Sequence, residues 1–334
     1  MTPFRFAVLL AICVAWGLHF SVVKSTITGV PPIFYAAMRM TLVAVFLIPF
    51  LKWHRGQMKL IFAAGACFGA LNYATFFSGL KYVPASIGAI VIEFYVPAAM
   101  IFSVIFLHER VGWRRIVGAT LAIVGILIII SGGDAGLGPD DRLFLGGLLV
   151  MCGALSEAAG AILVKKIDAI APLQMLAWFG AVGAVSCWVF TLLFEQNQFD
   201  FLSEAGRTNV FLAVLYSAVI ASIFGHSSYY WLLQRVDVSQ IAPAGLMTTV
   251  FAVAGGVFLL GETFTLRLAA GALVTMTGVA IIVVRSAQRA TERETEPLPV
   301  AGPVGVRIEE SNLATDNEPD AADEAEELKP ENAT

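Results

Sequence analysis

Residues 82–130 read YVPASIGAIVIEFYVPAAMIFSVIFLHERVGWRRIVGATLAIVGILIII, and residues 235–283 read RVDVSQIAPAGLMTTVFAVAGGVFLLGETFTLRLAAGALVTMTGVAIIV. The two stretches align without a gap at an offset of 153 residues. Apolar residues match easily by chance, so the stronger evidence is a loop Glu and two glycines spaced alike: Glu109 with Glu262, Gly118 with Gly271, and Gly125 with Gly278. The sequence therefore predicts an internal duplication.

Composition places the chain in a membrane. Of its 334 residues, 58% are hydrophobic and 14% are charged, whereas soluble domains are nearer half apolar and a quarter charged. Apolar runs of about 20 residues, enough to cross ~30 Å of hydrocarbon, recur along the chain. We expect an all-α polytopic membrane protein.

Punctuation by proline and glycine separates ten expected transmembrane helices. A Gly/Asp-rich loop at 131–142 divides them into two five-helix repeats, 4–131 and 143–285. Because five crossings separate matching points, the two repeats are expected to be inverted relative to each other, as in many secondary transporters. The expected helices are 4–23, 33–51, 59–80, 85–107, 112–131, 143–164, 172–194, 209–234, 239–260 and 266–285.

Charge is unevenly distributed. Residues 287–334 carry a net charge of −9 and the rest carries +5, so the acidic balance belongs to a tail that is poor in aromatic residues. We expect this tail to be disordered, with partner binding as the alternative. Placing the N-terminus in the cytoplasm puts 11 Lys and Arg residues on the inner side and 5 on the outer side. The prediction is a plasma (inner) membrane protein with both termini cytoplasmic and a first helix that is retained rather than cleaved.

The sequence lacks the patterns that enzymes and metal sites use. We find no GxxxxGK[ST], HExxH, HxxxH or CxxC, and no nucleophile–base pair. We therefore expect no enzyme activity, no cofactor, no metal and no nucleic-acid partner. The four cysteines are interpreted as small packing residues within apolar segments: Cys13, Cys67, Cys152 and Cys187.

Ionisable and amide side chains inside membrane helices are rare because they are costly there, and they mark cavities or substrate paths. Glu93 is the strongest candidate for substrate binding and coupling. Pro97 follows it by one turn and removes the hydrogen-bond donor to its carbonyl, which favours a kink. Glu93 is not a symmetric structural element, because Leu246 is its repeat mate. The full set of polar candidates is His19, Arg39, Asn72, Glu93, Glu157 and His226.

Each polar candidate also has a structural interpretation. Glu157 is a second candidate for substrate binding and proton coupling, or it pairs with a nearby lysine. Arg39 neutralises Glu93 or binds a substrate carboxylate, and the histidines are proton relays or packing residues. Glu109 and Glu262 are expected to cap the helices that follow them.

Aromatic residues at matched positions of the two halves could line a pocket, although aromatics at helical spacing more often pack. Phe76 and Phe77 correspond to Tyr229 and Tyr230 in the repeat. A quaternary ammonium substrate would use such rings together with Glu93. The tyrosine candidates for substrate binding are Tyr73, Tyr95, Tyr229 and Tyr230.

WGLHFSVVK at Trp16–Lys24, VPP at Val30–Pro32 and Arg39, together with the loops after LHER and LLGE, resemble the EamA family of the drug/metabolite transporter superfamily. Within it, the chain is similar to the O-acetylserine/cysteine exporters. The resemblance covers roughly residues 8–285 and implies ten helices, two inverted halves, a central cavity and export of small metabolites. His19 stands where the family commonly has Asn, and Glu157 stands where the second half has Trp.

We therefore expect a secondary transporter that exports small polar metabolites by alternating access, with proton coupling through Glu93 and Glu157. The resemblance implies that these metabolites are amino acids or their derivatives. One alternative is an exporter of cationic or aromatic drugs. An alternative of another class is a membrane scaffold or receptor that signals through its acidic tail. Frequent small residues at four-residue spacing favour close helix packing and could also serve a homodimer.

Overall fold

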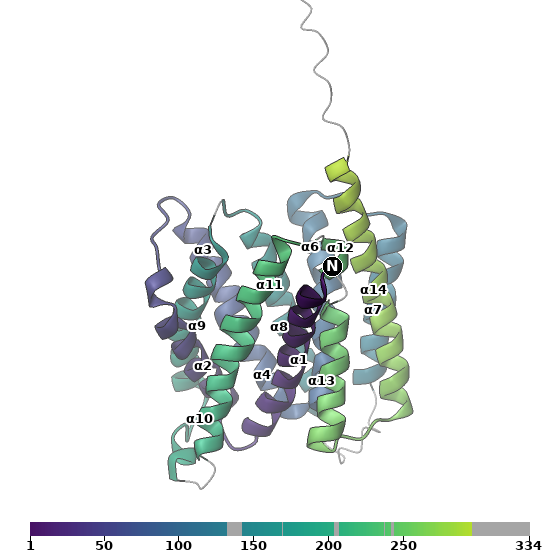
Figure 1. The fold of residues 1–334 in the computed structure, drawn as a ribbon. Coiled ribbons are helices and arrows are strands. Elements are labelled where there is room, and N and C mark those ends of the chain that lie inside the picture. The colour runs from purple at the N-terminus through teal and green to yellow at the C-terminus, as the bar shows by residue number, and fades with distance from the viewer. Residues whose placement is uncertain (132–141, 169, 204–206, 237, 242–243, 296–334) are drawn as a thin grey trace, which may run out of the picture. The chain divides into compact units, whose positions relative to one another are not determined.

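The computed structural model describes residues 1–131, 142–168, 170–203, 207–236, 238–241 and 244–295 (Figure 1). These residues form helices and no strands, and residues 1–295 make one packed unit. The expected acidic tail lies mostly beyond residue 295 and hence outside the described residues.

The helices of the first half follow the expected order, with short irregular segments inside two of them. Three of the described helices begin at a proline, which has no N–H to leave unpaired at a first helical position. The elements are α1 (Pro3–Thr26), α2 (Pro32–Phe46), a 3₁₀ turn (Ile48–Phe50), α3 (Met58–Gly65), a π-helical segment (Ala66–Leu71), α4 (Asn72–Tyr82), α5 (Ala85–Val91), a 3₁₀ turn (Ile92–Phe94), α6 (Tyr95–Leu107) and α7 (Trp113–Ile130).

The second half repeats this plan. Its third helix again contains a π-helical segment, and its last helix runs on past the apolar stretch through residues that favour helix, such as Ala, Gln, Arg and Glu. The elements are α8 (Arg142–Val164), α9 (Pro172–Phe194), a 3₁₀ turn (Asp200–Ser203), α10 (Arg207–Leu215), the π segment (Tyr216–Phe224), α11 (Gly225–Leu233), α12 (Val238–Ile241), α13 (Ala244–Leu260) and α14 (Leu266–Thr295).

Eight described helices are long and apolar enough to cross a membrane, and α2 and α13 are shorter, at 15 and 17 residues. The expectation that the second helix reaches residue 51 is wrong. It ends at Phe46, and the next turn contains Pro49, which cannot donate to a helical carbonyl. Ten complete crossings stay a prediction. The start of α1 and the end of α14 lie at the same end of the bundle (Figure 1).

The repeat glycines hold α7 against α14. A Cβ at Gly118 would lie 2.7 Å from the Gly278 carbonyl oxygen, and one at Gly125 would lie 2.7 Å from that of Gly271. Residue numbers increase along α7 in the direction in which they decrease along α14, so the two helices are antiparallel. Each glycine of α7 therefore contacts the repeat mate of the other glycine of α7. This pairing is what an inverted duplication produces. It also uses these glycines within one chain rather than between two.

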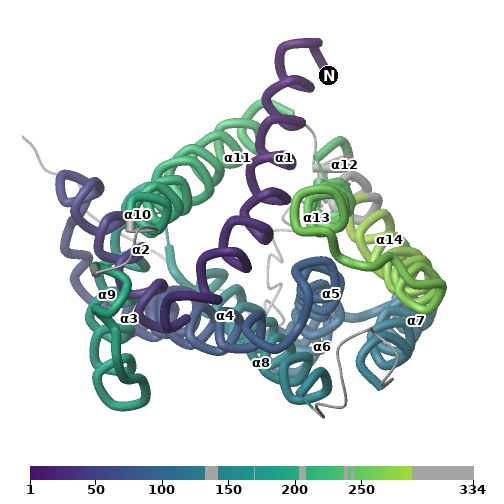
Figure 2. The backbone as a smooth tube through the Cα atoms, turned by 90° about the horizontal axis from the view of Figure 1, so that it is seen from below, coloured from purple at the N-terminus to yellow at the C-terminus, as the bar shows by residue number. Residues whose placement is uncertain are grey.

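The first helix of each half packs against the fourth helix of the other half. The first helix of the chain, α1, packs along α13, and α8, the first helix of the second half, packs along α6. Figure 2 shows α1 running between α11 on one side and α13 on the other. The space between the halves is thus walled by helices from both.

Carboxylates of the second half cap helices of the first. Both oxygens of Glu195 accept backbone N–H groups at the start of α2, from Ile33 and Phe34, each at 2.8 Å. Glu262 does the same at the start of α5, accepting from Ala85 and Ser86. An acid at a helix N-terminus satisfies orphan donors and meets the positive end of the helix dipole.

The expectation that Glu262 caps the helix after it is therefore wrong. That helix, α14, is capped by the Thr265 hydroxyl, which accepts from the Leu268 N–H at 3.1 Å. Gly256 leaves the room that the carboxylate needs, because a Cβ there would lie 2.4 Å from Oε2 of Glu262. Lys24 completes the clamp on the turn between α4 and α5 by donating to the Leu80 carbonyl at 2.7 Å.

Glu109, the repeat mate of Glu262, forms a different contact. Its carboxylate lies 3.2 Å from Lys165 Nζ in a largely exposed ion pair. Partial burial favours the protonated Glu109 carboxyl, but the hydrogen bond and charge of Lys165 outweigh it and lower the pKa of this group.

Gly125→Val should lower the free energy of unfolding by about 1–3 kcal/mol, because the added methyl groups force α7 and α14 apart. Gly245→Ala is the control, since a Cβ at that helical glycine meets nothing within 4 Å. Thermal unfolding in detergent measures both. Equal stability of the two variants would contradict the close packing of these helices.

Glu262→Ala should cost about 1–2 kcal/mol of stability, because two N–H groups of α5 lose their acceptor. The matched substitution Glu109→Ala removes an exposed ion pair and should cost less than ~1 kcal/mol. Denaturant unfolding of both variants tests the difference. A larger loss at Glu109 would show that the cap on α5 contributes little.

Candidate functional site

A cavity of about 430 Å³ lies between the two halves, within the ~300–1,000 Å³ range of ligand pockets. Helices of both halves line it, and its wall runs from Trp16 and His19 on α1 to Val164, the last residue of α8, and Met175 in the first turn of α9. The cavity therefore extends from mid-bundle toward the end at which α8 ends and α9 begins.

At the opposite end of the bundle, the cavity is sealed by packed apolar side chains, and a separate pocket lies beside the end of α1. The ends of α1 and α4 and the start of α5 bury a continuous apolar cluster there, and none of its members at that end lines the cavity. This cluster includes Val23, Ile27, Val30, Leu80 and Val83. The cavity is thus closed on the side where Glu262 and Lys24 hold the α4–α5 turn.

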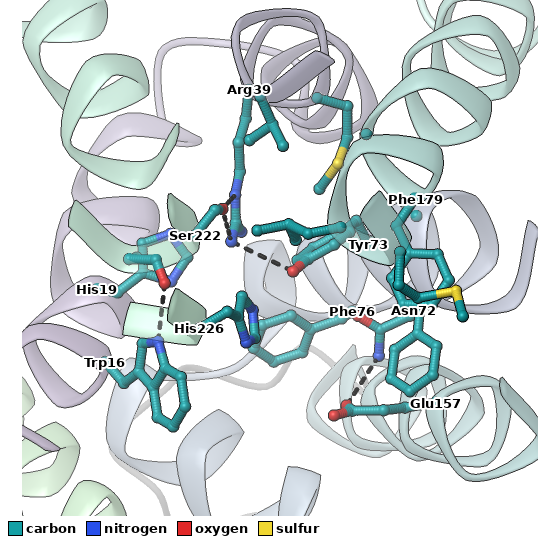
Figure 3. Close-up of a pocket in the computed structure, with 18 of the residues that line it drawn as sticks. Trp16, His19, Arg39, Asn72, Tyr73, Phe76, Glu157, Phe179, Ser222 and His226 are labelled. Atoms are coloured by element: carbon teal, nitrogen blue, oxygen red, sulfur yellow. Dashed lines mark hydrogen bonds between the residues drawn. The ribbon is translucent and has the colours of Figure 1, made fainter. Parts of the chain in front are cut away.

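Arg39 of α2 is the most deeply buried charge at the cavity, with 3% of its surface exposed. Its guanidinium donates through Nη2 to the Ser222 hydroxyl at 2.9 Å and to the Tyr73 hydroxyl at 3.2 Å. It also stacks on the Tyr73 ring, with its central carbon 4.3 Å from the ring centroid. These contacts are drawn in Figure 3.

No carboxylate within the described residues pairs with Arg39, whose polar partners are Ser222 and Tyr73. Its Nη1 atom is buried without a hydrogen-bond partner among them. A buried cation without a countercharge is costly, and a buried N–H without an acceptor adds to that cost. Such a group in a cavity wall is suited to bind an anionic ligand group.

Glu157 of α8 also lines the cavity. One of its oxygens accepts from the Asn72 side-chain amide at 3.2 Å, and the same amide nitrogen donates to the Gly153 carbonyl at 2.9 Å. Asn72 thereby fixes α4 to α8 and orients the acid. Among the described residues, neither Lys165 nor Lys166 forms an ion pair with Glu157, and Lys165 pairs with Glu109 instead.

The two histidines are held by neutral partners. His19 Nε2 lies 3.0 Å from the Ser217 hydroxyl, which also contacts the Tyr35 hydroxyl. His226 packs its ring against Trp16, with centroids 5.3 Å apart, and against Tyr230. Both histidines line the cavity, and the described residues include no cluster of three or more groups able to hold a metal.

Two π-helical segments occupy equivalent places in the two halves and both face the cavity. Ala66–Leu71 contributes Phe68 and Gly69, and Tyr216–Phe224 contributes Ala221 and Ser222. Extra residues of this kind in a helix recur at functional sites. The Trp16 indole N–H donates to the Ala221 carbonyl at 2.8 Å, which ties α1 to the second segment.

Seven of the ten predicted site residues line the cavity. Those that line the cavity are His19, Arg39, Asn72, Tyr73, Glu157, His226 and Tyr230. Three lie outside its lining. Glu93, on the 3₁₀ turn between α5 and α6, accepts a short hydrogen bond from Thr249; Tyr95 begins α6; Tyr229 packs behind the wall on Trp16.

Sequence reasoning missed Trp16, Ser222 and the aromatic pair Phe68 and Phe179. Ser222 is not ionisable, so a search for ionisable side chains in membrane helices does not select it. The repeat offset could have found it, because Ser222 is the mate of Gly69. Phe68 and Phe179 stack with ring centroids 5.0 Å apart, a contact between distant segments.

A bundle whose described residues include eight helices long and apolar enough to cross a membrane, with a cavity between its two halves, is typical of a membrane transporter. Residues 5–131 and 144–284 match the EamA-like transporter family. The chain belongs to this family, which makes it a transporter rather than an enzyme and confirms the resemblance seen in its motifs.

Relatives in the family carry functional names. A Salmonella typhimurium protein named "Probable amino-acid metabolite efflux pump" is 29% identical over 85% of this chain and 96% of its own length. The Escherichia coli protein of the same name is 27% identical over 82% of this chain and 93% of its own. An uncharacterised inner membrane transporter of Escherichia coli is 26% identical over 78% and 84%.

A solved crystal structure shares the fold, with a TM-score of 0.58 at 17% identity over 87% of this chain and 99% of its own.

Arg39→Met should leave the unliganded protein as stable as the wild type or raise its free energy of unfolding by roughly 1–3 kcal/mol, because an uncompensated buried charge is removed. Thermal unfolding in detergent without added ligand measures this. A loss of several kcal/mol would mean that Arg39 serves packing rather than a ligand.

Proposed function

We propose that the protein is an inner-membrane exporter of small polar metabolites of the amino-acid class. The observation that carries the proposal is Arg39, a buried cation with a free N–H group in the wall of a cavity between the two halves. The family and the names of two relatives support the substrate class, and the name of a third supports the inner membrane.

Alternating access is the mechanism that this geometry supports. The cavity reaches one end of the bundle, and an apolar cluster closes the other. Export then requires the α4–α5 turn to leave its clamp at Glu262 and Lys24 while the opposite end closes. Inverted halves make the two end states of similar construction, so the exchange needs no large energy difference.

Both termini are proposed to be cytoplasmic. The excess of Lys and Arg at the end where α1 begins supports this orientation. The cavity would then face the cytoplasm, from which an exporter takes its substrate.

Proton antiport is proposed to run through Glu157 and Glu93. Glu157 lines the cavity, and a proton and a cationic substrate group would compete for its carboxylate. Glu93 binds Thr249 of α13, so a change in its charge would alter a contact between the halves.

The cationic-drug alternative is weaker. The cavity has the rings that a drug would need, such as Trp16, Phe76 and Phe179, but Arg39 repels a purely cationic ligand. The scaffold alternative depends on the acidic tail, which lies outside the described residues.

Reconstituted protein should exchange labelled O-acetylserine or cysteine across vesicles that are preloaded with the unlabelled compound. Arg39→Gln should lower this exchange at least about tenfold, the loss expected from one charge-assisted hydrogen bond. Arg114→Gln, at an exposed site on α7, is the matched control and should exchange normally.

A pH gradient should drive accumulation in the wild type, and Glu157→Gln should remove that dependence. Exchange of cationic dyes without any exchange of amino-acid metabolites would contradict the proposal.

A further inference from the structure

The cavity holds two opposite charges that do not meet. Arg39 and Glu157 come from different halves, on α2 and α8, and both line it (Figure 3). Neither has a charged partner among the described residues: Arg39 binds Ser222 and Tyr73, and Glu157 binds Asn72. Opposite charges attract strongly where water is scarce, so their separation requires a structural cause.

That cause is α4. Tyr73 holds Arg39 at 3.2 Å, and its neighbour Asn72 holds Glu157 at 3.2 Å. Consecutive residues of a helix point about 100° apart, so the two side chains lead the charges to different parts of one wall. Asn72 is fixed further by the Gly153 carbonyl, and Tyr73 by the guanidinium stacked on its ring.

Each charge also keeps one atom free for a ligand. Nη1 of Arg39 is buried and has no hydrogen-bond partner among the described residues. Glu157 uses Oε2 for Asn72, and within the same residues its Oε1 atom has no partner. A donor and an acceptor of opposite charge therefore remain unused in one cavity.

We propose that Arg39 and Glu157 together bind a zwitterion, with the substrate carboxylate on Nη1 of Arg39 and the substrate ammonium on Glu157. This inference rests on the proposed function and adds the orientation of the substrate to it. A ligand bearing both groups neutralises both buried charges at once, whereas a ligand bearing one leaves the other uncompensated. The stacked rings of Phe68 and Phe179 offer the carbon skeleton an apolar wall.

The test uses four compounds with the same four-carbon skeleton: 2-aminobutanoate, 4-aminobutanoate, butanoate and butylamine. Binding to the purified full chain is measured by titration calorimetry and by thermal stabilisation. The wild type should bind a zwitterion roughly tenfold or more tightly than either singly charged compound. The better of the two amino acids reports whether the ammonium is α or ω to the carboxylate.

The variants assign the two ends. Arg39→Gln should weaken binding of the zwitterion and of butanoate roughly tenfold or more and should not weaken binding of butylamine. Glu157→Gln should weaken binding of the zwitterion and of butylamine and should not weaken binding of butanoate. Arg39→Met and Arg39→Lys serve if Arg39→Gln does not fold, and Arg114→Gln controls for charge outside the cavity.

The outcomes separate the two proposals. Zwitterion binding that neither substitution weakens overturns the assignment of the two ends and leaves the exporter proposal to the exchange assay. Tighter binding of butylamine than of both amino acids overturns the inference in favour of a cation site. A wild type that neither binds nor exchanges any amino-acid compound overturns both.

Discussion

The close approach of α7 and α14 is the constraint on which the rest of the structure depends. Gly118 meets Gly278 and Gly125 meets Gly271, so backbone packs on backbone where any side chain would intervene. In lipid, helices gain little from hydrophobic burial against one another, and small residues that allow such contact provide much of the attraction. The contact fixes α7 and α14 antiparallel. The first helix of each half then packs on the fourth helix of the other, and a cavity remains between the halves.

Symmetric features of this protein build the scaffold, and departures from symmetry build the site. The repeat glycines and the two π segments recur in both halves. In contrast, Tyr73 corresponds to His226, and Glu93 corresponds to Leu246. Even Glu109 and Glu262, which match in sequence, differ in partner: one forms an exposed ion pair and the other caps a helix of the other half.

The charged groups on the cavity wall have only part of their hydrogen-bonding capacity met by the described residues. Ser222 and Tyr73 meet part of the guanidinium of Arg39, and Asn72 meets half of the carboxylate of Glu157. A protein built only for stability would pair these charges or replace them with apolar side chains. Their presence in an otherwise apolar bundle supports the proposed binding site.

The sequence by itself determined the membrane class, the duplication, the order of the helices and seven of the residues that line the cavity. It could do so because a membrane helix is recognised by a long apolar run. An ionisable residue inside such a helix also usually faces a cavity or a partner. Tertiary structure alone decided which of these residues meet. Arg39 binds Ser222, 183 positions away, rather than Glu93, and Glu262 caps α5 rather than its own neighbour. Such partners follow from how the halves pack, and neither helical periodicity nor hydropathy carries that information.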